Sequence, residues 1–193
     1  HNYIEQIFSL ESVGCKDWLT NKVDRCVGGK VAKQQCVGEL QLPLNNCGVM
    51  ALDYSTKHGV ATSIGHSPVS ALIDPNAGSK NSIAEALTNI IWAPIENGLK
   101  GVSLSANWMW PCKNKGEDAR LYKAVESVSK FAIELGINIP TGKDSLSMNQ
   151  KYENLEVKSP GTVIVSATAH CNNISNIIEP VFKLDKGSIF YIN

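Results

Sequence analysis

The stretch PTGKDSLSM, residues 140–148, combines a glycine, a lysine and hydroxyl side chains, which are groups that hold phosphate in loops. The usual P-loop reads G-x-x-x-x-G-K-[ST]. Here Ile137 stands five positions before Gly142, and Asp144 follows Lys143. We therefore predict a loop after the strand-like LGINIP that either holds phosphate in another architecture or is simply a polar turn.

Glu85 and Asn89 are four residues apart in NSIAEALTNIIWA, a segment (81–93) whose apolar residues have helical spacing. On a helix, both side chains leave the same face one turn apart. A carboxylate and an amide oxygen are hard ligands that suit Mg²⁺, which takes water and phosphate oxygens as further ligands. An ordinary solvated helix face would carry the same pair.

Four further residues are weaker candidates. Asn107 stands near the end of the strand-like KGVSLSANWMW (100–110), and strand ends often face ligand crevices, although a hydrogen-bonded turn is the alternative. Arg25 and Lys30 flank CVGG and could contact an anion or simply be solvated. Among the histidines, His66 is the one worth testing, and the others are interpreted as structural.

Composition excludes several functional classes. The 193 residues are 43% hydrophobic and 19% charged, which is typical of a globular protein. Eighteen basic and eighteen acidic side chains cancel, so no nucleic-acid or membrane-surface partner is expected. The sequence also lacks an apolar run near the ~20 residues of a membrane span.

The six cysteines form no C-x-x-C pair and have no histidine at zinc-finger spacing. A chain of this length can bury a core without disulfides. Reduced, mostly buried thiols in a cytoplasmic protein are the expectation.

Alternating helix and strand patterns, with one hairpin, predict a mixed sheet of the α/β or α+β class. The expected helices lie within 3–22, 81–93 and 116–136, and the expected strands are 47–54, 59–66, 100–110, 161–169 and 187–193. We expect a helical connecting segment at 1–23, one domain at 24–173, and at 174–193 the start of a connection to a further domain.

The chain resembles formylglycinamide ribonucleotide amidotransferase, also called phosphoribosylformylglycinamidine synthase, in five segments that stand in the same order: NKVDRCVGGKVAKQQCVGELQLPL, IAEALTNIIWAP, GVSLSANWMWPC, GEDARLY and LGINIPTGKDSLSM. The match covers nearly all of residues 16–170 and indicates the large, multidomain form. The resemblance implies the N-terminal domain fold of aminoimidazole ribonucleotide synthetase, a mixed sheet with helices on one face. Two such domains pair into an eight-stranded β-barrel.

The resemblance also implies an activity, that of an ATP-dependent carbon–nitrogen ligase of purine biosynthesis. In the family, ATP activates the amide oxygen of formylglycinamide ribonucleotide, and glutamine-derived ammonia then displaces the phosphate. The partners implied are the remaining domains of the parent enzyme, including a glutaminase domain. This chain shows no glutaminase motif, so on its own it is expected to be inactive, and no residue is assigned as catalytic.

Site residues are implied by matching motifs. EALTN matches a family metal motif, which makes Glu85 and Asn89 Mg²⁺ ligands beside the phosphates of ATP or ADP. The GKDS stretch matches a loop in which Gly142 and Lys143 contact nucleotide and Ser145 contacts substrate. Asn107 is assigned to the nucleotide as well, as is Asn46.

Two positions depart from the family pattern. Lys143 stands where smaller family members have an asparagine metal ligand, so a cation replaces an amide. Asn46, in PLNNCGV, stands where the family has an aspartate ligand, and losing that charge should weaken metal binding. Three hypotheses stay open: part of the ligase's nucleotide and substrate site, a scaffold domain that at most holds a nucleotide, and, more weakly, an unrelated phosphate binder. We also expect the isolated chain to form a homodimer, because a half-barrel exposes sheet edges and an apolar face.

Overall fold

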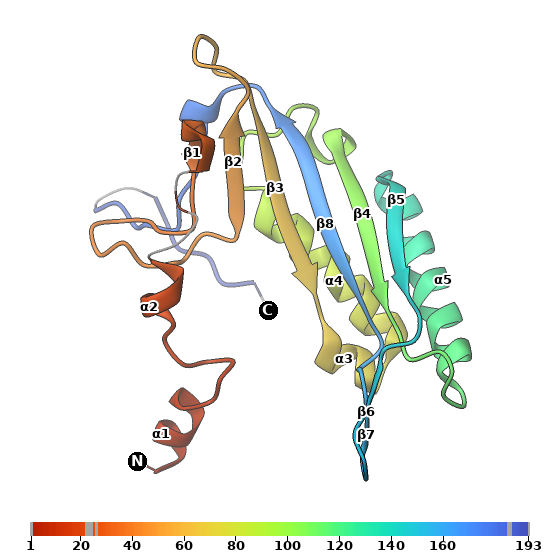
Figure 1. The fold of residues 1–193 in the computed structure, drawn as a ribbon. Helices are drawn as coiled ribbons and strands as arrows, with labels where there is room; N and C mark the ends of the chain where they lie inside the picture. The colour runs from red at the N-terminus through yellow and green to blue at the C-terminus, as the bar shows by residue number, and fades with distance from the viewer. Residues whose placement is uncertain (1, 22–24, 26, 185–186, 193) are drawn as a thin grey trace.

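The computed structural model describes residues 2–21, 25, 27–184 and 187–192. A six-stranded sheet forms its centre (Figure 1). In spatial order the strands are β1 (Val31–Lys33), β2 (Cys47–Ala51), β3 (Gly59–His66), β8 (Thr162–Cys171), β4 (Val102–Met109) and β5 (Asn138–Ser145). Neighbours pair antiparallel except for β4 and β5, which are parallel. The predicted mixed sheet is confirmed.

The main helices all cover one face of the sheet (Figure 1). They are α3 (Pro68–Ile73), α4 (Pro75–Ile90) and α5 (Glu117–Leu135). The helix α4 packs on β3 and β8, and α5 packs on α4 and β5. In the described ranges, none of the helices combines the length and the apolar character that a membrane crossing requires.

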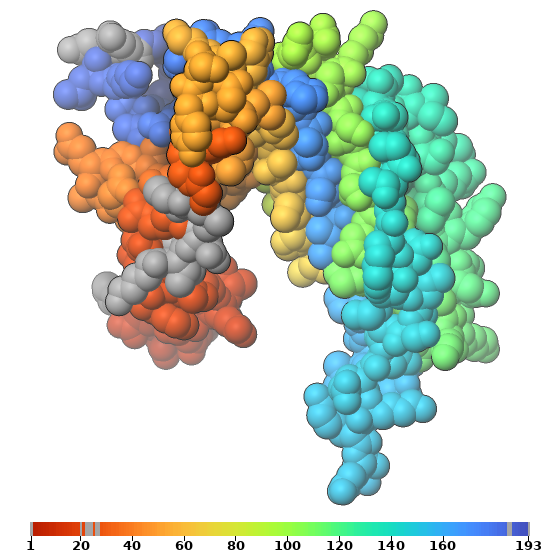
Figure 2. Space-filling view, turned by 45° about the horizontal axis from the view of Figure 1, so that its top comes forward, coloured from red at the N-terminus to blue at the C-terminus, as the bar shows by residue number. Residues whose placement is uncertain are grey.

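Two small parts project from the sheet. The helices α1 (Asn2–Phe8) and α2 (Asp17–Thr20) lie beyond β1, and the hairpin of β6 (Asn149–Lys151) and β7 (Glu156–Lys158) lies beyond β5. Figure 2 shows these red and cyan projections on either side of the sheet, with a hollow between them.

The core lies between the sheet and its helices because alternate residues of a strand point to opposite faces. In β8, Val163, Val165 and Ala167 are completely buried on the helix-covered face. The residues that alternate with them along β8, including Ser166 and Thr168, lie on the other face, which carries no helix in the part of the chain described. That helix-free face is consequently polar in its middle.

The helix expected at 81–93 begins earlier, at Pro75. Asp74 caps it, since its carboxylate accepts a hydrogen bond from the Asn76 N–H at 2.9 Å. Pro75 takes the first helical position, where the missing N–H of proline is harmless. The dipeptide Asp74-Pro75, which is also typical of turns, thus begins a helix here.

Three strand predictions need correction. The stretch TGKDS is not a loop, since β5 runs through it to Ser145 in parallel with β4. The strand expected at 187–193 is absent from residues 187–192, and residue 193 lies outside the described part. Conversely, β1 lies in the polar segment where no strand was predicted, because its pairing with β2 supplies the hydrogen bonds.

Five of the six cysteines lie among the described residues, and all five are free thiols. Cys36, Cys47 and Cys171 are buried. This agrees with the expectation of reduced, mostly buried cysteines, while Cys26 falls outside the described residues.

Candidate functional site

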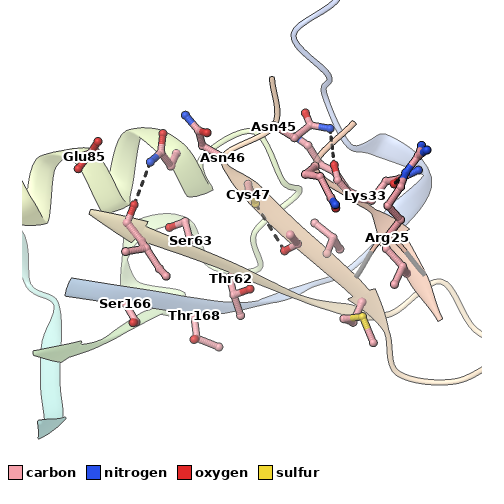
Figure 3. Close-up of a pocket in the computed structure, with 18 of the residues that line it drawn as sticks. Arg25, Lys33, Asn45, Asn46, Cys47, Thr62, Ser63, Glu85, Ser166 and Thr168 are labelled. Carbon is pink, nitrogen blue, oxygen red and sulfur yellow. Dashed lines mark hydrogen bonds between the residues drawn. The ribbon is translucent and has the colours of Figure 1, made fainter. Parts of the chain in front are cut away.

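A pocket of about 860 Å³ opens where the short strands β1 and β2 meet β3 and α4 (Figure 3). Its wall is rich in amide and hydroxyl groups and holds few charges. The polar lining residues are Arg25, Lys33, Gln34, Gln35, Asn45, Asn46, Thr62, Ser63, His66, Glu85, Asn89, Ser166 and Thr168. Three of the predicted site residues, Asn46, Glu85 and Asn89, therefore come together here, and so does His66.

The pocket reaches both sides of the sheet at this corner. Ser63 is buried on the helix-covered side, where its hydroxyl donates to the Ala86 carbonyl oxygen at 2.6 Å. Thr62 and Thr168 are register partners on the helix-free side. Figure 3 shows Glu85 with Ser63 on one side of the strands and Thr168 on the other.

Glu85 and Asn89 complete the hydrogen bonding of β3. Since β2 begins at the level of Ser63, the last three residues of β3 have no β2 neighbour. Glu85 Oε2 accepts from the His66 backbone N–H at 2.6 Å, and Asn89 Nδ2 donates to the Ile64 carbonyl oxygen at 3.0 Å. Two side chains of α4 thus replace the missing strand and fix the helix against β3.

These contacts leave oxygen atoms for a ligand. They use Oε2 of Glu85 and the amide nitrogen of Asn89, so Oε1 and Oδ1 remain. Asn46 adds a third, uncharged oxygen at the same wall. Within the described ranges no group of three His, Cys, Asp or Glu side chains could hold a metal. The donor set fits a cation such as Mg²⁺, which keeps several waters and takes phosphate oxygens.

The wall also contains a buried ammonium group that sequence reasoning missed. Lys33 is only 4% exposed, and its Nζ donates to the Ile178 carbonyl oxygen at 2.8 Å. Burial lowers the pKa of Lys33, while its interactions with Cys47 and Glu179 act in the opposite direction. Burial also raises the pKa of the Cys47 thiol above its usual value, so that thiol is neutral at pH 7.

Arg25 supplies the second cation of the pocket. Its Nε donates to Gln34 Oε1 at 2.8 Å, and a terminal nitrogen donates to Gln41 Oε1. Both acceptors are neutral amides, so they orient the guanidinium without cancelling its charge. The sequence-based suggestion that Arg25 reaches an anion stays a prediction, now with a pocket beside it.

The other predicted site residues form a separate group on β4 and β5. Asn107 and Lys143 are register partners, and Lys143 Nζ donates to the Ser145 hydroxyl. The Oδ1 atom of Asn107 is buried and has no hydrogen-bond partner within the described ranges. These residues do not line the pocket.

Gly142 has a structural explanation. A Cβ atom at this position would lie 2.5 Å from the Ala106 carbonyl oxygen of the neighbouring strand. The close approach of β4 and β5 therefore requires glycine here, whether or not phosphate binds.

One row of register partners connects the two groups across the sheet: His66, Ile164, Asn107 and Lys143. Neighbouring strands are ~4.8 Å apart, so this row spans roughly 14 Å. The row lies on the helix-free face, because Asn107 and Ile164 are the sequence neighbours of Ala106 and Val165, whose side chains are buried on the opposite face. The pocket and the group around Lys143 thus share one surface.

Solved structures identify the class of fold. PurLQS from Thermotoga maritima superposes with a TM-score of 0.64 at 16% sequence identity, over 86% of this chain and 25% of that chain. T. maritima PurL complexed with AMPPCP gives a TM-score of 0.58 at 16% identity, over 80% and 23% of the two chains. The molecule is a mixed α+β domain with the PurM-like fold.

Sequence similarity narrows the class to one family. The model of the FGAR-AT PurM_N-like domain matches residues 15–170, and the chain belongs to this family. It is 45% identical to the probable phosphoribosylformylglycinamidine synthase of Caenorhabditis elegans over 96% of its length. It is 42% identical to the Homo sapiens phosphoribosylformylglycinamidine synthase over 97% of its length. In both cases the chain spans 14% of the relative.

Proposed function

We propose that this chain is a nucleotide-binding domain of a phosphoribosylformylglycinamidine synthase. In that role it contributes nucleotide, Mg²⁺ and substrate contacts to the conversion of formylglycinamide ribonucleotide, ATP and glutamine-derived ammonia into formylglycinamidine ribonucleotide. The observation that carries the proposal is the pocket in which α4 presents Glu85 and Asn89 beside Asn46. The names of the relatives support it, as do structures of T. maritima PurL complexed with ATP, ADP and FGAR.

In this proposal Glu85 and Asn89 hold Mg²⁺ beside the phosphates of ATP or ADP. The cation, when bound, neutralises phosphate charge and fixes the phosphate oxygens. The chain's own residues then orient the nucleotide, because both ligands are anchored to β3 by hydrogen bonds. Asn46 contributes an oxygen without a charge, which lowers the affinity for the metal relative to an aspartate.

The group on β4 and β5 is proposed as the second part of the site. Asn107, Gly142 and Lys143 face nucleotide, and Ser145 faces formylglycinamide ribonucleotide. Lys143 and Ser145 already contact each other, so an anionic ligand would have an ammonium and a hydroxyl side by side. The roughly 14 Å row across the sheet is long enough for one extended ligand or for two neighbouring ones.

The chain on its own is expected to lack ligase activity. The proposed partners are the other domains of the parent enzyme, including a glutaminase domain, in the cytoplasm. We take residues 24–173 as the domain, 1–23 as a connecting segment and 174–193 as the start of the next connection. An assay with ATP, formylglycinamide ribonucleotide and ammonia should show no turnover, and robust turnover would contradict this part of the proposal.

Self-association is a further expected outcome. The six-stranded sheet is open, with edges at β1 and β5, and its helix-free face includes the half-exposed Met50 and Ile64. A second PurM-like domain that covers this face would close the β-barrel that the family resemblance implies. We expect a homodimer of the isolated chain by light scattering. A monodisperse monomer at micromolar concentration would count against this pairing.

Exchanging Glu85→Gln should reduce the Mg²⁺-dependent affinity for ADP about tenfold or more, since each tenfold step corresponds to ~1.4 kcal/mol. Glutamine keeps an oxygen that accepts from the His66 N–H, so the fold should be preserved, but it removes the charge that attracts the cation. Calorimetric titration with ADP in Mg²⁺ and in EDTA measures the effect. Glu134→Gln, on the exposed surface of α5, is the matched control. Equal Mg²⁺ dependence in both variants would remove Glu85 from the metal site.

A further inference from the structure

We propose that Lys33 is a direct anion ligand of this pocket. A nucleoside diphosphate is then held by a side-chain ammonium as well as by Mg²⁺, and part of its binding persists without any divalent cation. This inference deepens the proposed nucleotide site and rests on it. It assigns to β1 a role that the sequence did not indicate.

The first observation is the burial of Lys33. The residue is 4% exposed, and among the described residues its ammonium has one hydrogen-bond acceptor, the Ile178 carbonyl oxygen. An ammonium has three N–H donors, so two remain. Removing such a group from water is unfavourable unless it is paired. A ligand that brings negative charge to this place would compensate for that burial.

The second observation is the lack of a carboxylate partner. The ion pairs found among the described residues involve Arg120 and Lys130, not Lys33. Its electrostatic neighbours are Cys47, whose thiol is kept neutral by burial, and Glu179, which stands outside ion-pair distance on the wall of an adjoining pocket of about 460 Å³. The charge of Lys33 is therefore available to a ligand.

The third observation identifies the kind of ligand. Asn45 lines both pockets beside Lys33, and its amide nitrogen donates to the Gln34 carbonyl oxygen at 2.7 Å. Its Oδ1 atom is buried and has no hydrogen-bond partner in the part of the chain that the structure describes. This site therefore offers a cation and an unused acceptor side by side. A nucleoside diphosphate matches both groups, because its anionic oxygens can pair with the ammonium and its O–H and N–H groups can donate to the acceptor. Inorganic phosphate matches mainly the ammonium.

The charge balance of the pocket points the same way. Of its described lining residues, Arg25 and Lys33 are cationic and Glu85 is the one carboxylate. Asn46 adds no negative charge. The pocket consequently attracts an anion even before a metal enters, whereas a site with two carboxylates would need the metal first.

Three variants separate the contributions of Lys33 and of the metal ligands. The wild-type chain should bind ADP in Mg²⁺ and should bind it more weakly, but measurably, in EDTA. Lys33→Gln removes the charge and keeps a donor for the Ile178 carbonyl, so we expect at least a tenfold loss of affinity in EDTA. Glu85→Gln should keep the EDTA-resistant affinity and lose the gain that Mg²⁺ provides. Lys33→Arg should retain most of the EDTA-resistant affinity.

The probes and the folding control make the result decisive. Adenosine, which lacks phosphate, should bind to Lys33→Gln and to the wild type with equal affinity. Inorganic pyrophosphate should bind more tightly to the wild type than to Lys33→Gln. If Lys33→Gln does not fold by circular dichroism, Lys33→Met, of similar volume, replaces it. Equal ADP affinity of wild type and the uncharged variant in EDTA would overturn the proposal, and so would wild-type binding that vanishes in EDTA. In either case, Mg²⁺-dependent ADP binding would still support the proposed function. If ADP did not bind under any condition, both the role of Lys33 and the proposed function would be overturned.

Discussion

Replacing Trp110 with alanine is expected to lower the free energy of unfolding by about 3–5 kcal/mol, the usual range for a buried tryptophan. Trp110 is completely buried directly after β4. Its ring lies against the backbone of Gly161, where a Cβ atom would approach within 2.3 Å of it. The backbone N–H of Trp110 donates to the Ser145 carbonyl oxygen at 2.8 Å. Removing the ring therefore leaves a cavity where β4, β5 and β8 converge.

Urea unfolding followed by circular dichroism measures this loss. Trp18→Ala is the matched control because Trp18 is 70% exposed, and it should change the stability by less than ~0.5 kcal/mol. Trp110→Phe should fall between the two, since it keeps an aromatic ring and removes an indole N–H that has no partner within the described residues. A loss below about 1 kcal/mol for Trp110→Ala would show that the surrounding core collapses onto the gap.

Gly65→Ala is expected to destabilise the chain by more than about 3 kcal/mol, beyond the ordinary range for an overpacked core. A Cβ atom at Gly65 would lie 2.1 Å from the Ser82 carbonyl oxygen and 2.4 Å from the Ala86 nitrogen. Both contacts are to the backbone of α4, so no side chain can rotate away. The helix itself would have to move off β3.

The same substitution should weaken ADP binding, because Gly65 lies between the two β3 residues that Glu85 and Asn89 contact. Gly48→Ala is the control for the effect on stability: its Cβ atom would meet Thr62 Oγ1 at an ordinary 3.6 Å. We expect the control to unfold at nearly the wild-type urea concentration. A Gly65→Ala variant with wild-type stability and ADP affinity would mean that α4 does not pack on β3 closely enough to exclude a Cβ atom at Gly65.

Local signals were sufficient to predict the elements that depend on nearby residues. The helix expected at 116–136 has apolar residues at helical spacing and a glycine at its end, and Gly136 does end α5 with φ at 68°. The hairpin of β2 and β3 followed from two strand-like runs around a polar turn. The pair Glu85 and Asn89 was found because a helix fixes residues four apart on one face.

Features that depend on distant residues were not predictable in this way. Strand β5 extends to Ser145 because β4 offers a parallel partner more than thirty positions earlier in the chain. Lys33 is buried by Ile178 and its neighbours, which are separated from it by 145 residues. No local pattern distinguishes such a lysine from a solvated one. The division of the predicted site into a pocket and a separate group likewise depends on the order of the strands.

That order has a consequence for how the protein is made. Strand β8 is the last strand of the sheet to be synthesised, yet it lies between β3 and β4 and is hydrogen-bonded to both. Until the ribosome has released residue 171, the two halves of the sheet have no strand to join them, and both present unpaired backbone edges. Pairings over such long sequence separations form slowly. Folding is therefore expected to follow translation of the whole domain, and the nascent chain is most in need of a chaperone just before β8 emerges.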